Sequence, residues 1–230
     1  MHRGAVKDWD LMEKLWHNLV DNASFSSLEN MSVLIIESVR SSVAERSHWA
    51  ELLFNTFHVP SICFGNSSSL SIFASGRTSG IAVECGAGLT ATVPVFEGLV
   101  LKHATITMDY AGQDISINLR KLFAEKNVQV DLNSAKIIKE RMAHTQGFRN
   151  KDMEHTIKDN VSFCLPDGND VTVETKILRE CTDPLFINTK TSGGLISQLH
   201  ESIVLCDDSL KRDLSQNIII SGGTSMIPGN

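Results

Sequence analysis

The sequence predicts an α/β fold, in which helices pack on the faces of a β-sheet. Three observations lead to this fold class. Strand and helix patterns alternate from residue 33 to residue 76, and two β-rich runs joined by a glycine turn follow at 80–98. A further apolar strand at 218–220 runs into two more glycines. Alternating strands and helices are typical of layered α/β proteins.

The first predicted element is an amphipathic helix over residues 9–20. Trp9, Met12, Trp16 and Leu19 recur at helical spacing, and Asp8 is placed to cap the first turn. The continuous apolar run 33–36 then predicts a strand that is covered on both faces. A helix at 43–56, a short strand at 61–64 and a serine-rich helix ending at residue 76 complete this part.

The pattern changes to period two at residue 80, where GIAVE, CGAG and LTATVPVFEG predict a hairpin. Helices are expected at 115–123 and 137–142, and Asn133 or Ser134 could cap the second of them. Residues 148–154 are charged and unpatterned, which predicts a loop. The run 161–173 reads as two strands around a Pro-Asp-Gly turn. Helices at 195–205 and 208–214 then lead into the strand 218–220.

The chain has 230 residues, of which 42% are hydrophobic and 21% charged, a balance typical of one or two folded domains. Its net charge of −6 and its scattered basic residues argue against nucleic acid as a direct partner. No apolar run is long enough to span a bilayer, and the opening MHRGAVKDWD lacks the apolar core of a secretion signal. We therefore expect no membrane partner and a cytoplasmic location, or a nuclear one.

The patterns of common catalytic and metal sites are absent from the sequence. It contains no Walker A loop, GxGxxG, GxSxG, HExxH or EF-hand spacing. The five cysteines lie far apart without zinc-ligand spacing, which predicts buried free thiols. Two glycine turns remain, CGAG at 85–88 and SGGT at 221–224. Glycine there could bring backbone N–H groups close to a phosphate, or could serve turn geometry alone.

Several long segments resemble the actin and actin-related protein family. They are RGAVKDWDLMEKLWHNL, VLIIES with LLFNTFHVPSICF, LSIFASGRTSGIAVECGAGLTATVPVFEG, MDYAGQD and KRDLSQNIIISGGTSMIPG. Their order and spacing agree over nearly the whole chain, and 148–193 is the most divergent stretch. The resemblance implies an incomplete two-lobed, ribonuclease-H-like ATPase fold, truncated at both ends. Residues 1–76 would belong to the first lobe and 77–230 to the second, with roughly 112–195 as its more variable part.

The resemblance implies ATP or ADP with Mg²⁺ as cofactors, and a phosphate loop at 84–90. Glu84 would reach Mg²⁺ through water, and the loop residues expected at the phosphates are Gly86, Ala87, Gly88 and Leu89. Ala87 and Ala91 stand where the family has polar side chains. Ser67 occupies the position that orients the attacking water, and its side chain is too short for that role. These changes should weaken hydrolysis more than binding, leaving at most a weak ATPase.

The same resemblance places the nucleoside against three further segments. The expected contacts are Gly112 and Asp114 on the ribose side, Lys139 and Glu140 on a helix, and Gly222, Gly223, Thr224 and Met226 at the adenine-side turn. Backbone amides in the bends 85–88 and 221–224 should then face each other across a gap of nucleotide size.

Three functions are compatible with the sequence. The first is a divergent, nucleotide-binding cytoskeletal component that contacts actin or actin-like protomers. The second is a non-polymerising scaffold subunit of a larger assembly, such as a chromatin-remodelling or motor-adaptor complex. The third is an ATP-hydrolysing chaperone or sugar kinase of the same superfold. The tryptophan-containing helix and the ASGRTSG string favour the actin family over these last relatives.

Overall fold

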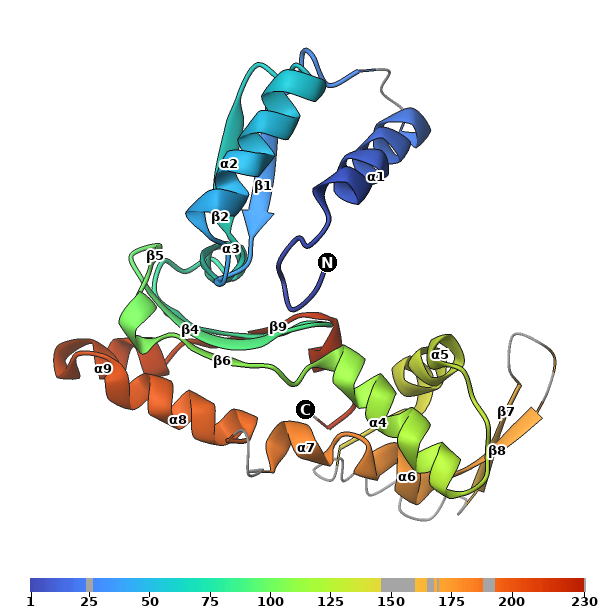
Figure 1. Ribbon diagram of the computed structural model, residues 1–230. Coiled ribbons are helices and arrows are strands. Elements are labelled where there is room, and N and C mark those ends of the chain that lie inside the picture. Colours follow the sequence, from blue (N-terminus) through green and yellow to red (C-terminus); the bar gives the residue numbers. More distant parts are fainter. Residues whose placement is uncertain (24–26, 146–159, 165–167, 169, 188–192, 230) are drawn as a thin grey trace.

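The computed structural model describes residues 1–23, 27–145, 160–164, 168, 170–187 and 193–229. Figure 1 shows a central sheet with the first elements of the chain above it and two long C-terminal helices below it. The predicted α/β fold class is confirmed. Within the described part, no helix combines the length and the apolar character needed to cross a membrane.

The first part of the chain contains two helices and a small parallel sheet. Helix α1 (Trp9–Asn22) begins as predicted, with the Asp8 carboxylate accepting from the backbone N–H of Leu11. Strand β1 (Val33–Glu37) pairs in parallel with β2 (Ile62–Asn66). Between them lies α2 (Val43–Glu51), whose last residues continue into the π-helical turn Leu52–Thr56. The buried side chains of this part gather between the helices and the sheet.

Strand β1 is not covered on both faces, so that prediction is wrong. Ile35 is buried, whereas the side chains of Leu34 and Ile36 are 53% and 62% exposed. Ile35 packs in the same buried cluster as Leu52 and Leu53, which follow α2. Alternate side chains of a strand point to opposite faces, and only the inward set meets this layer in the described part of the chain.

The central sheet has the strand order β5–β4–β3–β9, with β6 pairing to β4 as well. Its strands are β3 (Gly80–Cys85), β4 (Thr90–Phe96), β5 (Leu99–Val100), β6 (Ile106–Met108) and β9 (Ile218–Ser221). The predicted hairpin is confirmed, because β3 and β4 run antiparallel. Strand β9 lies parallel to β3 on its other side, with Glu84 opposite Ser221.

Helices cover both faces of this sheet. Helix α3 (Ser67–Ala74) packs on one face, where Ile72 is buried with Ala82, Val93 and Val95. Helices α8 (Leu195–Leu205) and α9 (Asp208–Ser215) cover the other face. Helix α3, which the predicted division counts with the first lobe at residues 1–76, packs on the central sheet. The division into two lobes stays a prediction.

The remaining elements form a separate cluster beside the sheet. They are α4 (Gly112–Glu125), α5 (Leu132–Met142), β7 (Asn160–Cys164), β8 (Asp170–Glu174), α6 (Thr175–Glu180), α7 (Asp183–Phe186) and a final 3₁₀ turn (Gly223–Met226). The 3₁₀ turn Lys102–Ala104 instead packs on the central sheet, where Ala104 is buried in the same cluster as Leu195 of α8. The predicted strand pair is confirmed, since β7 and β8 are antiparallel. Helix α5 is capped by Asp131, not by Asn133 or Ser134, because the Asp131 carboxylate accepts from both of their backbone N–H groups. The predicted loop 148–154 lies outside the described residues.

The cysteines divide into a buried and an exposed set. Cys85, Cys181 and Cys206 are buried as predicted, and burial raises the pKa of the Cys85 thiol to about 11. Cys63 and Cys164 are exposed, so the prediction is wrong for these two. Both lie on strands, Cys63 on β2 and Cys164 on β7, at positions that are exposed.

Candidate functional site

The two glycine bends leave the central sheet at one edge and touch each other. Strands β3 and β9 are parallel neighbours, so their carboxyl ends, and the bends that follow, lie side by side. The Thr224 hydroxyl donates to the backbone oxygen of Gly86 at 2.8 Å. The predicted gap between the bends is therefore absent. The bends lie against each other, and residues of both line two cavities.

The larger cavity has a volume of about 560 Å³ and lies between the bends and two helices. Ala87, Gly223 and Thr224 come from the bends, and Lys139 and Glu140 come from α5. The rest of its lining consists of Gln113, Ser116, Leu132, Asn133, Lys136 and Ile227. This wall combines two ammonium groups with amides and apolar side chains.

The smaller cavity, of about 430 Å³, lies beside the same bends. Its lining includes five of the predicted phosphate-loop residues, Glu84, Gly86, Ala87, Gly88 and Leu89. The other lining residues are Gly4, Ser38, Ser67, Ser71, Ala91, Ser221 and Gly222. Both bends thus contribute to both cavities, and Ala87 lines each of them.

Lys139 carries a buried amine in the wall of the larger cavity. Its side chain is 7% exposed, and its Nζ donates to the backbone oxygen of Gly112 at 2.9 Å. Burial lowers the pKa of this amine, because the charged form loses hydration. An ammonium has three donor hydrogens, and the described residues place no carboxylate within ion-pair distance of this one. The remaining donors suit an anionic or hydroxyl-bearing ligand in the cavity.

Glu84 and Ser67 meet at the smaller cavity. The Ser67 hydroxyl donates to Glu84 Oε2 at 2.9 Å, and Asn66 caps the helix that Ser67 begins. Burial raises the pKa of the Glu84 carboxyl, and the hydrogen bond from Ser67 partly offsets this. The Ser67 hydroxyl, which the resemblance places at the position that orients the attacking water, therefore donates its hydrogen to a carboxylate.

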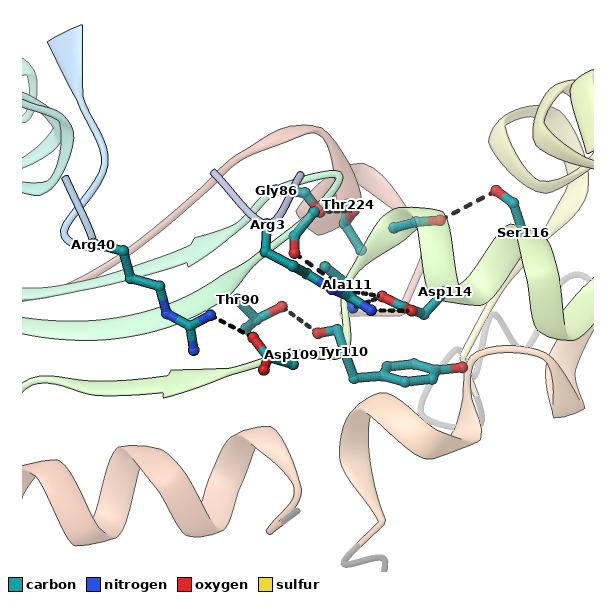
Figure 2. A network of polar contacts seen from close by, with 12 residues as sticks. Arg3, Arg40, Gly86, Thr90, Asp109, Tyr110, Ala111, Asp114, Ser116 and Thr224 are labelled. Carbon is teal, nitrogen blue, oxygen red and sulfur yellow. Dashed lines mark hydrogen bonds and ion pairs between the residues drawn. The ribbon is translucent and has the colours of Figure 1, made fainter. Parts of the chain in front are cut away.

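Asp114 is directed to Arg3 instead of to a cavity. Figure 2 shows the Arg3 guanidinium between the Gly86–Gly88 bend and the start of α4. It forms a bidentate ion pair with the Asp114 carboxylate, in which Nη2 lies 2.7 Å from Oδ1. It also donates to the Gly88 backbone oxygen at 3.2 Å. Asp114 also accepts from the backbone N–H of Ala111. This predicted ribose-side residue holds the bend and α4 together.

Gly112 and Met226 do not line either cavity in the structure. The backbone N–H of Gly112 donates to Gly86, and its carbonyl accepts from Lys139, so Gly112 joins the bend to the helix wall. A side chain at Gly112 would collide with Thr224. The Met226 side chain is 80% exposed, and the next residue, Ile227, lines the larger cavity in its place.

Several lining residues were not predicted from the sequence. Lys136 lies one turn before Lys139, so the helical spacing of α5 could have indicated it. Gln113 follows Gly112 directly, and its backbone N–H donates to Ala87 at 2.7 Å. Gly4, Ser38 and Ser71 approach the smaller cavity from three separate segments, and no sequence pattern links them.

A known protein family matches the chain over its whole length. The family model described as Actin matches residues 1–159 and 135–230. The chain belongs to the actin family. This assignment confirms the resemblance and the actin-like fold, and members of this family generally bind ATP or ADP with Mg²⁺.

The two cavities fit such a ligand unequally. The larger one offers the buried amine of Lys139 and mixed polar and apolar walls, which suit a nucleoside and its first phosphate. The smaller one offers serine hydroxyls and the Glu84 carboxylate, on a wall made largely of glycine and alanine. Among the described residues, no group of three metal-binding side chains is present. Mg²⁺ normally keeps several waters and binds through one or two carboxylates plus phosphates, so Glu84 fits an ion that a nucleotide delivers.

Proposed function

We propose that this actin-family protein binds ATP or ADP in the two cavities beside the glycine bends. The observation that carries the proposal is the buried Lys139 amine, which faces a cavity of nucleotide size with donors to spare. Lys139 and the bends would hold the phosphates, while Glu140, Gly223 and Ile227 would border the nucleoside. Bound Mg²⁺ would neutralise phosphate charge, and Glu84 is the residue that would orient its waters.

We infer that hydrolysis is weak or absent. Ser67 donates to Glu84 and cannot extend far enough to hold a water for attack on a terminal phosphate. Ala87 and Ala91 bring no polar group to the smaller cavity. Phosphoryl transfer depends on orienting the attacking water and stabilising charge, and these side chains supply neither. Release of phosphate from ATP is expected to stay close to the level of a protein-free control.

The binding proposal is tested by titrating the 230-residue protein with a fluorescent ATP analogue, with and without Mg²⁺. Saturable binding is expected, and its absence would overturn the proposal. Lys139→Met removes the amine while preserving side-chain length, and should raise Kd at least about tenfold, since hydrogen bonds to charged groups contribute about 1.5–3 kcal/mol. Lys121→Met, at an exposed position on α4, makes the same chemical change away from both cavities and should leave Kd unaltered.

We further propose a cytoskeletal role in the cytoplasm, with actin or actin-like protomers as partners. Membership of the actin family supports this role. Sedimentation at rising protein concentration, with Mg²⁺ and ATP, separates it from the scaffold role. Pelleting above a critical concentration is expected for a polymerising protein, whereas a constant soluble fraction would favour a scaffold subunit.

A further inference from the structure

The two cavities differ sharply in charge. The larger one has two lysines and one glutamate in its wall. Among the described residues that line the smaller one, Glu84 is the single ionisable side chain, and the others are glycine, alanine, leucine and serine. A ligand in the smaller cavity therefore meets a half-buried carboxylate without a lysine, arginine or histidine in the lining.

The nearest guanidinium does not correct this imbalance. Arg3 adjoins the smaller cavity through its neighbour Gly4, and its charge is already paired with Asp114 (Figure 2). One of its N–H groups also donates to the Gly88 backbone oxygen, so the bend takes up a further donor of Arg3. Turning it toward a phosphate would leave the Asp114 side chain, which is 17% exposed, without its counter-ion.

We propose that, without a divalent cation, the cleft binds a nucleoside diphosphate more tightly than the matching triphosphate, and that Glu84 sets this preference. The inference rests on the proposed nucleotide binding and deepens it. A third phosphate adds negative charge at the end of the nucleotide that enters the smaller cavity, next to the Glu84 carboxylate. The neighbouring hydroxyls can donate hydrogen bonds, but they carry no compensating charge.

The size of the effect follows from Coulomb's law. Two like charges at an assumed separation of about 8 Å, and at an effective dielectric constant of about 20–40, repel strongly enough to change Kd by about tenfold. A divalent cation between carboxylate and phosphate reverses the sign of the local field, so Mg²⁺ should remove most of this difference. The diphosphate preference is thus expected in chelator and should shrink when Mg²⁺ is added.

The test is competition of AMP, ADP and ATP against a fluorescent nucleotide at pH 8, first in EDTA and then in Mg²⁺. In EDTA, ADP is expected to displace the probe at about tenfold lower concentration than ATP. Glu84→Gln should tighten ATP by about that factor in EDTA while leaving AMP unchanged. Glu97→Gln, at an exposed position in the turn that follows β4, makes the same change in net charge and should alter none of the three.

Each other outcome overturns a defined part of the reasoning. Equal affinities in EDTA, or tighter ATP, would refute the diphosphate preference while nucleotide binding stands. A preference that survives in Glu84→Gln would refute the assignment to Glu84. If AMP, ADP and ATP all failed to compete for the parent protein, and its circular dichroism showed a folded chain, the preference and the proposed function would both be overturned.

Discussion

Replacing Gly222 by alanine should destabilise the protein more than any other small change in the two bends. Gly222 has φ = 92° and ψ = 155°, a region of backbone conformation that is essentially restricted to glycine. An added Cβ would lie 2.7 Å from the carbonyl carbon of Cys85 and closer still to its oxygen. These atoms belong to the backbone of β3, so the contact can be relieved only by moving one strand away from its neighbour.

The backbone conformation alone costs about 1–3 kcal/mol, and the collision adds to it, so we expect a loss of about 3 kcal/mol. For a chain of this size, that loss corresponds to a fall in Tm of roughly 6–12 °C. Urea unfolding followed by circular dichroism measures the free energy directly.

Gly223→Ala is the matched control, because an added Cβ there meets nothing within 4 Å. It should change stability by less than about 1 kcal/mol. If the two variants unfolded at the same urea concentration, the close approach of the bends would be refuted. If Gly222→Ala matched the parent, the conformation assigned to Gly222 would be refuted as well.

Three further predictions follow from the charges and thiols. Arg3→Ala should lower the free energy of unfolding in urea by about 2 kcal/mol, because it breaks a partly buried bidentate ion pair. Arg40→Ala breaks an exposed pair and should lower it by about 0.5 kcal/mol. Equal losses would contradict this prediction. Because the folded-state pKa of Glu84 is raised above its ordinary 4.5, its contribution is most favourable below pH 4.5 and is lost as pH rises through the raised pKa. Glu84→Gln should therefore gain Tm relative to the parent as pH increases over that range, and a difference independent of pH would count against the raised pKa. Ellman's reagent should modify exposed Cys63 rapidly and buried Cys85 only after unfolding, as mass spectrometry of the labelled peptides can establish.

Much of the element order could be predicted from local pattern. The spacing of Trp9, Met12 and Trp16 predicted α1, and the CGAG turn between two runs of period two predicted the β3–β4 hairpin. Some short elements escaped prediction, among them β5, β6, α6 and α7, because so few residues seldom show a clear periodicity. Which face of a strand is covered could not be predicted either, because Leu34 and Ile35 have the same chemistry and differ only in what lies opposite.

The candidate site could also be predicted only in part. Family resemblance placed Glu84, Ala87, Lys139 and Thr224 at a common site, and the structure brings all four to the two cavities. It could not show that the bends touch, since this depends on the parallel pairing of strands more than 130 residues apart in the chain.

The sequence by itself determined the order of strands and helices and the two glycine turns, because these follow from the chemistry of neighbouring residues. The tertiary structure decided which charges have partners. It gave Arg3 to Asp114 and left Glu84 without a basic neighbour in the lining of the smaller cavity. Such pairings join segments that are distant in the chain, and electrostatic interaction depends on distance in space, which local pattern does not contain.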